Sequence, residues 1–200
     1  MASARVFLLR HGETALNAAG VLRGQLDIPL NETGEAEALA LGGAFRDVPL
    51  SAVVSSPLKR ALETASPVAS ASRAPLSIDE RLSDRFYGEL AGHSLEHVEK
   101  RFGSIDAAPL VEAWQLLEAR AEEAFLDAVA SVVAAGPGGS VALVTHDAVI
   151  RALLRLLVPT LGSVKLELPT GSWSELVDDM PASQWRAVHL GELPTNGLRP

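Results

Sequence analysis

The 200 residues suit one domain, or one domain with a small insertion, and a hydrophobic fraction of 48% is enough for a large core. A formal net charge of −8 and the lack of a basic stretch argue against a protein that binds nucleic acid without sequence preference. Because the chain has no cysteine, disulfides, thiolate catalysis and cysteine zinc sites are excluded. No apolar run has the length of a membrane span and the N-terminus lacks a signal-type segment, so we expect a cytoplasmic protein with no membrane partner.

Apolar runs and segments of helical periodicity alternate along the chain. We expect strands over residues 6–9, 50–54, 75–78, 141–144, 164–168 and 185–190. We expect helices over residues 31–45, 57–71, 95–101, 111–134 and from 146 to about 157. Asn31 is expected to cap the first helix and Ser56 the second, with Pro57 at the first helical position. Strands that alternate with helices predict a three-layer α/β/α fold, with a mostly parallel central sheet and helices on both faces.

Three stretches lack a clear period. Residues 14–29 are expected to form a loop, which carries Asn17, Arg23 and Gln25. Residues 81–93 are irregular, with several charges and two glycines. The tail over 191–200 is rich in glycine and proline and is expected to be loose.

Polar side chains stand at the ends of three expected strands. Arg10 and His11 follow the first strand, Arg60 lies just beyond the second, and His146 follows the strand over 141–144. Parallel strands place their carboxyl ends on one edge of a sheet, so two histidines and two arginines can converge there. Arginine forks hold phosphoryl oxygens and an imidazole can attack phosphorus in line. The pattern indicates phosphoryl transfer, with a carboxyl group of the 81–92 loop as proton donor.

Five segments carry recognisable motifs: LRHGET at 9–14, GQLDIPL at 24–30, SSPLKRALETA at 55–65, LSDRFYG at 82–88 and THDAVIRAL at 145–153. In this order they resemble the histidine phosphatase superfamily, the phosphoglycerate-mutase-like proteins. The resemblance extends from about residue 5 to about residue 155, and it implies the fold of those proteins.

The resemblance also implies roles for the matching residues. His11 would be the nucleophile, phosphorylated on a ring nitrogen. Arg10, Arg60 and His146 would hold the phosphoryl oxygens, with help from Asn17. The family needs no metal, so neither a metal nor another cofactor is implied. His93 and His97 have the spacing of metal ligands, but no third ligand is evident.

The acid motif and its surroundings depart from the family pattern. Asp84 would protonate the leaving oxygen and then take a proton from water, but this branch usually has glutamate there, and Glu89 is a rival acid. Asp147 stands where a glycine usually follows the second histidine, and we expect it to turn away and cap the helix. Arg23 and Gln25 are candidate substrate contacts, with a solvated loop as the alternative.

The sequence therefore predicts a phosphomonoesterase that hydrolyses small phosphorylated metabolites through a phosphohistidine intermediate. One alternative is a phosphoglycerate mutase, and another is a non-catalytic phosphate-binding protein. The resembling mutases are longer and carry an extra basic stretch after the acid motif, whereas residues 92–115 contain only Lys100 and Arg101 as basic residues. This difference favours hydrolysis.

For the domain organisation, we expect a single domain over residues 1–190, present as a monomer or a homodimer. Residues 81–115 are expected to form a small cap within it that determines substrate choice.

Overall fold

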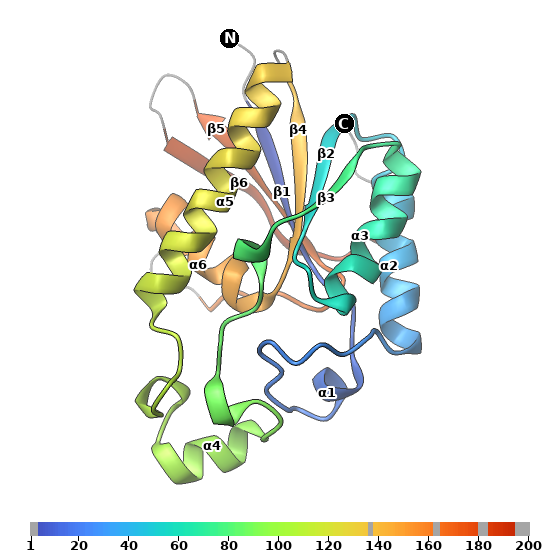
Figure 1. The fold of residues 1–200 in the computed structure, drawn as a ribbon. Helices are drawn as coiled ribbons and strands as arrows, with labels where there is room; N and C mark the ends of the chain where they lie inside the picture. Colours follow the sequence, from blue (N-terminus) through green and yellow to red (C-terminus); the bar gives the residue numbers. More distant parts are fainter. Residues whose placement is uncertain (1–3, 136–137, 162–164, 180–183, 195–200) are drawn as a thin grey trace.

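A six-stranded sheet with the order β3-β2-β4-β1-β5-β6 forms the centre of the protein (Figure 1). The computed structural model describes residues 4–135, 138–161, 165–179 and 184–194. The strands are β1 (Arg5–Arg10), β2 (Leu50–Ser55), β3 (Leu76–Ile78), β4 (Ser140–Thr145), β5 (Trp173–Asp179) and β6 (Gln184–Glu192). β3, β2, β4 and β1 are parallel, and β5 runs antiparallel to both of its neighbours. The mostly parallel sheet is confirmed.

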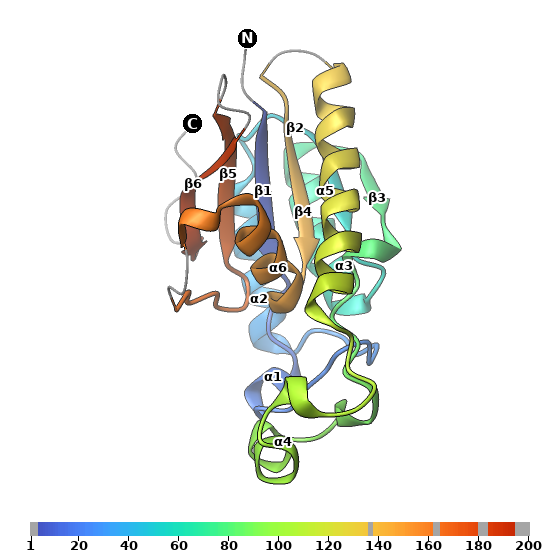
Figure 2. The same cartoon turned by 90° about the vertical axis from the view of Figure 1, so that its left-hand side faces the viewer.

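Helices cover both faces of this sheet (Figures 1 and 2). One face carries α2 (Glu32–Ala44) and α3 (Lys59–Ser72), and the other carries α5 (Trp114–Ala135) and α6 (Asp147–Leu157). In β1, Phe7 and Leu9 belong to the core with α2 and α3, whereas Val6 and Leu8 belong to the core with α5 and α6. Successive side chains of a strand point to opposite faces, so a continuous apolar run buries both. The three-layer fold predicted from the sequence is confirmed.

A smaller group of elements lies at the carboxyl ends of the parallel strands. This group includes α1 (Ala15–Ala18), α4 (Leu95–Phe102) and the short 3-10 helices Gly88–Leu90 and Ile105–Ala107 (Figure 1). It has a small apolar core of its own, made by Leu22, Leu90, Val98 and Ala108. Leu22 connects the loop after α1 to residues 92–93. The N–H of Leu22 donates to the carbonyl of His93 (2.9 Å), and the carbonyl of Leu22 accepts from the N–H of Gly92 (2.8 Å). Part of the 14–29 loop thus packs with residues 87–108.

The end of the chain differs from the sequence prediction. The expected strand over 164–168 is wrong: residues 165–168 form no strand, and residue 164 lies outside the described residues. Charged and apolar side chains alternate over residues 165–168 as they do in a strand. However, the carbonyls of Leu166 and Leu168 accept side-chain hydrogen bonds from Arg151 and Arg10. The strand that was missed is β5, which contains a buried Glu175 paired with Arg5 across the sheet at 2.7 Å. A carboxylate interrupts the apolar pattern from which a buried strand is predicted, and its burial is explained by the ion pair with Arg5.

Smaller differences concern where elements begin and end. The expected loop over 14–29 contains α1, and the helix expected from residue 111 begins at Trp114. α3 begins at Lys59 with Leu58 as its N-cap, so the capping role expected for Ser56 is wrong. Residues 191–192 belong to β6, although we expected a loose tail there, and 195–200 lie outside the described residues. No described helix is long and apolar enough to cross a membrane.

Candidate active site

His11 lies just beyond the end of β1, with its backbone N–H bonded to the carbonyl of Thr145 at 3.0 Å. Its Nδ1 is 2.6 Å from the carbonyl oxygen of Gly12. A carbonyl can only accept, so Nδ1 carries the hydrogen and the lone pair is on Nε2. Burial, together with the charges of Arg60 and Arg10, lowers the pKa of His11 well below its ordinary value. The imidazole is therefore neutral near pH 7, and the electron pair for attack on phosphorus is on Nε2, which accepts a hydrogen bond from Nε of Arg60.

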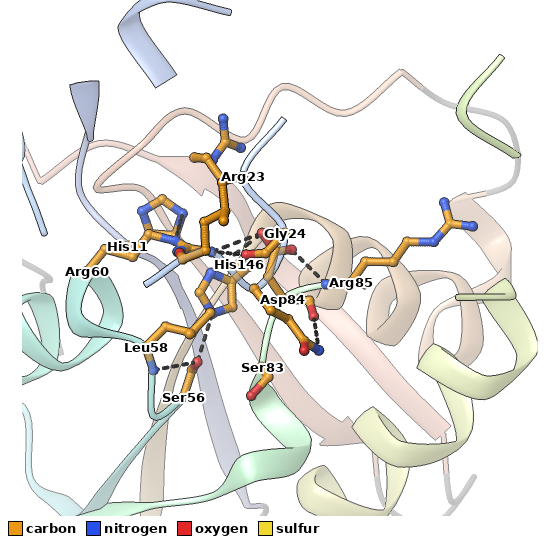
Figure 3. Close-up of polar contacts among 12 residues, drawn as sticks. His11, Arg23, Gly24, Ser56, Leu58, Arg60, Ser83, Asp84, Arg85 and His146 are labelled. Carbon is orange, nitrogen blue, oxygen red and sulfur yellow. Dashed lines mark hydrogen bonds and ion pairs between the residues drawn. The ribbon is translucent and has the colours of Figure 1, made fainter. Parts of the chain in front are cut away.

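His146 lies at the end of the neighbouring strand β4, with its ring centroid 5.1 Å from that of His11. Its Nε2 is 2.8 Å from Oγ of Ser56, and this oxygen accepts from the N–H of Leu58 at 3.3 Å (Figure 3). The Ser56 hydroxyl can therefore donate to Nε2, which places the imidazole hydrogen on Nδ1. This Nδ1 is buried and has no hydrogen-bond partner in the described part of the chain. Burial and Arg60 lower the pKa of His146 well below its ordinary value, so it is a neutral donor.

Arg60 lies in the first turn of α3 and has no exposed surface. Its Nε is 3.3 Å from Nε2 of His11, and its Nη2 is 3.1 Å from Oδ2 of Asp84. The carbonyls of Leu26 and Gly24 accept from Nη1 and Nη2, at 2.8 Å and 2.7 Å. These backbone carbonyls hold the cation in place beside His11.

Asp84 is buried beside Arg60 and His146, with 3% of its surface exposed. Its Oδ1 accepts from the N–H of Arg85 at 2.9 Å, and its Oδ2 is 4.0 Å from Nδ1 of His146 (Figure 3). Burial raises the pKa of the Asp84 carboxyl, although the charge of Arg60 opposes this. A carboxyl group that holds its proton more strongly suits a proton donor. Glu89, the rival acid, is exposed on the 3-10 helix Gly88–Leu90.

A cavity of about 410 Å³ opens beside these groups. Its charged and amide side chains are those of Arg10, Asn17, Arg23, Asp84 and Asp147, and the other lining residues are Gly20, Val21, Leu22, Tyr87, Leu95, Ile105 and Ala148. Within the described residues, the buried side-chain nitrogens that lack a hydrogen-bond partner are Nε of Arg10, Nε of Arg23 and Nδ1 of His146. Two of them belong to residues that line the cavity and the third lies next to Asp84. Unsatisfied buried donors are costly, so this group of three is suited to an anion with several oxygens.

Of the other site residues predicted from the sequence, Arg10, Asn17 and Arg23 line this cavity. Arg10 donates from Nη1 to the carbonyl of Leu168, and Arg23 donates from Nη1 to the carbonyl of Val21 at 3.1 Å. Asn17 accepts from the N–H of Thr14 at 3.1 Å in the capping box of α1. Gln25 does not line the cavity, and its Nε2 donates to the backbone carbonyl of Asp84 at 3.3 Å.

Asp147 does not cap α6, contrary to the expectation from the sequence. His146 is the N-cap residue, and the Asp147 carboxylate lines the cavity. It pairs with Arg151 one turn later on α6, at 2.7 Å and 3.0 Å, and lies 3.6 Å from Nη1 of Arg10. Two arginines thus offset a negative charge that would otherwise oppose an anion at this site.

The sequence interpretation missed Arg120 on α5, whose guanidinium donates to the backbone carbonyl of Asp84 at 3.1 Å. One signal was present: Arg120 shares the apolar stripe of Leu117, Ala121 and Ala124. A charged residue on such a stripe needs a buried partner.

His93 and His97 stack with centroids 4.8 Å apart on the exposed surface of the cap. Over the described ranges, no group of three or more His, Asp or Glu side chains is placed to hold a metal ion.

A model of the histidine phosphatase superfamily, branch 1, matches residues 6–192, which is nearly the whole chain. The chain belongs to this superfamily. Among curated histidine phosphatases, it is 36% identical over 149 residues to an uncharacterized phosphatase, PhoE, of Bacillus subtilis (strain 168), covering 74% of this chain and 75% of PhoE. It is 29% identical over 195 residues to the probable phosphoglycerate mutase GpmB of Salmonella choleraesuis, covering 92% of this chain and 88% of GpmB.

Solved structures agree with this assignment. A structure named mycobacterial hydrolase 1 superposes with a TM-score of 0.85 at 26% identity, over 96% of this chain and 99% of that one. The native structure of mycobacterial glucosyl-3-phosphoglycerate phosphatase superposes with a TM-score of 0.83 at 25% identity, over 94% and 99%. The family and the phosphatase class predicted from the sequence are confirmed.

Proposed function

We propose that this histidine phosphatase hydrolyses small phosphomonoesters through a phosphohistidine formed on Nε2 of His11. The observation that carries the proposal is the bond from Nδ1 of His11 to the carbonyl of Gly12, which leaves the Nε2 lone pair facing a buried arginine. Three unsatisfied N–H donors nearby provide partners for the phosphoryl oxygens.

In the first step, Nε2 of His11 attacks phosphorus and the bond from phosphorus to the leaving oxygen breaks. Asp84 gives its proton to that oxygen, so the leaving group departs as a neutral alcohol. Arg10, Arg60 and Nδ1–H of His146 stabilise the negative charge on the three remaining oxygens.

In the second step, water attacks phosphorus and the bond to His11 breaks. The Asp84 carboxylate takes a proton from this water, which returns both residues to their starting states and releases inorganic phosphate. Asn17 and Arg23, on the cavity wall, are placed to contact the substrate. For Gln25, whose amide donates to the carbonyl of Asp84, direct contact with substrate stays a prediction.

The cap is the region where we place substrate choice. Tyr87, Leu95 and Ile105 of the 81–115 segment contribute to the cavity wall, together with Val21 and Leu22 from the first loop. This supports the assignment of 81–115 as a specificity-determining cap on one domain. The cytoplasmic location and the monomeric or dimeric state stay predictions.

A phosphoglycerate mutase is the second candidate, favoured by the similarity to a probable mutase over almost the full chain. A mutase has to hold the carboxylate of its substrate. The basic residues of the 92–115 segment, Lys100 and Arg101, lie in the last turn of α4 and do not line the cavity. This arrangement favours hydrolysis.

The test measures release of free phosphate from 4-nitrophenyl phosphate and from a panel of phosphorylated metabolites. His11→Ala should reduce the rate to background, whereas His97→Ala, a change at an exposed histidine of the cap, should keep it. Full activity of the His11→Ala protein would rule out the phosphohistidine. Conversion of 3-phosphoglycerate to its isomer in the presence of a bisphosphate primer, without phosphate release, would identify a mutase. No turnover of any compound would favour a non-catalytic binding protein.

A further inference from the structure

Arg120 of α5 holds the loop over residues 81–86, the acid loop, which carries Asp84. All five N–H groups of Arg120 donate hydrogen bonds. Nη1 donates to the carbonyls of Arg81 (2.6 Å) and Ser83 (2.7 Å), and Nη2 donates to the carbonyl of Asp84 (3.1 Å). The remaining two bonds go to the carboxylate of Glu112, at 2.8 Å from Nε and 3.0 Å from Nη2. This side chain thus binds three carbonyls within four residues of the acid loop.

Glu112, which is bound to Arg120, holds the end of the acid loop at Phe86, so the two residues form a clamp on this loop. Its Oε2 accepts from the N–H of Phe86 at 3.1 Å, and its own N–H donates to the carbonyl of Phe86 at 2.8 Å. Its carbonyl accepts from Nε of Arg85 at 2.8 Å. Arg120 and Glu112 together therefore fix the backbone on both sides of Asp84.

The acid is an aspartate, and this makes the backbone position important. An aspartate has two side-chain torsions, one fewer than a glutamate, so it has less freedom to correct for a displaced backbone. The Asp84 carboxyl is also held at both oxygens, by the N–H of Arg85 and by Arg60. Proton donation requires the acid oxygen within about 2.6–3.2 Å of the leaving oxygen. A shift of the loop backbone would therefore move the carboxyl out of reach.

We propose that Arg120 is a positioning residue that sets the distance between the Asp84 carboxyl and the leaving oxygen by holding the backbone carbonyls of the acid loop. The inference rests on the proposed role of Asp84 as general acid. Because Arg120 makes no hydrogen bond to His11, Arg10 or Arg60, we expect its effect on the formation of the phosphohistidine, which kcat/KM reports, to act through Asp84. Substrates whose leaving oxygen needs a proton should depend on Arg120, and substrates with a stable anionic leaving group should not.

The test compares Arg120→Lys with the unchanged protein on two substrates. Lysine keeps the charge but has three N–H donors without the planar fork, so it cannot reproduce the five bonds. For an alkyl phosphate such as glycerol phosphate, kcat/KM should fall by about tenfold or more, a fraction of the 10²–10⁴-fold that a general acid contributes. For 4-nitrophenyl phosphate, whose leaving group departs without a proton, the loss should stay below about threefold.

The matched control is Arg155→Lys, which changes an arginine of α6 that pairs with Glu118 at 3.5 Å and stacks on Trp114. Its ratio of the two substrate rates should equal that of the unchanged protein. If Arg120→Lys does not fold, Glu112→Gln provides the same comparison, because it weakens the clamp at nearly constant volume. Equal losses on both substrates in these clamp variants would overturn the inference.

Asp84→Asn, measured in parallel, separates failure of the inference from failure of the proposed function. If Asp84→Asn slows the alkyl phosphate selectively and the clamp variants do not, then Arg120 is only structural and the acid assignment stands. If Asp84→Asn slows both substrates equally, Asp84 is not the acid and the inference fails with it.

Discussion

His11 and His146 lie at the ends of two adjacent parallel strands, and both imidazoles are buried. For each of them, burial is the main cause that lowers the pKa, followed by the charge of Arg60. Each imidazole also has one nitrogen fixed by a neighbour: Gly12 for His11 and Ser56 for His146. Burial therefore keeps both imidazoles neutral, and the hydrogen bonds to Gly12 and Ser56 determine which ring nitrogen carries the hydrogen.

Buried neutral histidines make stability depend on pH. In the unfolded chain each histidine takes a proton below about pH 6.5, whereas in the folded protein its pKa is lowered and it stays neutral. The unfolded state then binds more protons, so the free energy of unfolding falls as the pH decreases below 6.5. Between pH 7.5 and pH 5.5 the loss from His146 should be at most about 1.4 kcal/mol, the limit set by the titration of the unfolded chain.

Urea unfolding of His146→Asn at both pH values measures this contribution. The free energy of unfolding should decrease less in this variant than in the unchanged protein over this interval, by at most about 1.4 kcal/mol. His97→Asn, which replaces an exposed histidine, should lose as much as the unchanged protein. The same pH dependence in His146→Asn and in the unchanged protein would contradict the neutral, buried state of His146.

At the scale of elements, α2 supports the loop that follows β1. Gly34, in the first turn of α2, lies so close to Glu13 that a Cβ added to it would overlap the backbone of Glu13. A Cβ added to Gly12 would in turn overlap the backbone of Gly34. The carboxylate of Glu37 then accepts from the N–H of Glu13 at 2.8 Å. The residues around the candidate nucleophile are thus positioned by direct backbone contact with a helix.

Two glycines of the same helix provide a matched pair of substitutions. Gly34→Ala should destabilise the protein by about 1–3 kcal/mol, because the added methyl group forces α2 and the 11–14 loop apart. Gly43→Ala has open space around the new methyl group and should stabilise the protein by about 0.5–1 kcal/mol through helix propensity. Thermal unfolding and kcat for 4-nitrophenyl phosphate measure both changes, and kcat should fall only in Gly34→Ala. Equal stability of the two variants would show that the contact between Gly34 and Glu13 tolerates a side chain.

At the scale of the whole molecule, the candidate site joins the sheet to the cap. Arg10 and His146 come from the ends of β1 and β4, whereas Arg23 comes from the loop that packs with the cap. All three carry a buried nitrogen without a partner in the described residues. An anion bound to them would connect elements that are far apart in the sequence and would bind only the folded chain.

Inorganic phosphate should therefore raise the melting temperature. At a concentration one hundred times its Kd, phosphate should add about 2.7 kcal/mol to the free energy of unfolding. Potassium chloride at the same ionic strength should have a much smaller effect, and His146→Asn should lose most of the phosphate effect. Differential scanning calorimetry measures these shifts. A phosphate-dependent increase that is equal in His146→Asn and in the unchanged protein would place the anion elsewhere.

The parts of the protein that rest on local patterns followed from the sequence. The apolar runs predicted β1, β2 and β4, and helical periodicity with the cap Asn31 predicted α2. Parallel strands have their carboxyl ends on one edge, so the convergence of Arg10, His11, Arg60 and His146 also followed from the order of elements. These features depend on a few neighbouring residues or on topology alone.

The parts that depend on contacts between distant residues needed the tertiary structure. Glu175 is buried in β5 because Arg5 is its partner 170 residues earlier in the chain, and no periodicity records that pair. Asp147 pairs with Arg151 instead of capping α6. Arg120 reaches the acid loop from a helix 36 residues away from Asp84 in sequence. The sequence by itself determined the family, the three layers and the chemical groups of the candidate site, because local patterns and motifs encode them. Only the tertiary structure decided which nitrogens are free, which charges are paired and what holds the acid, because these depend on burial and long-range hydrogen bonds.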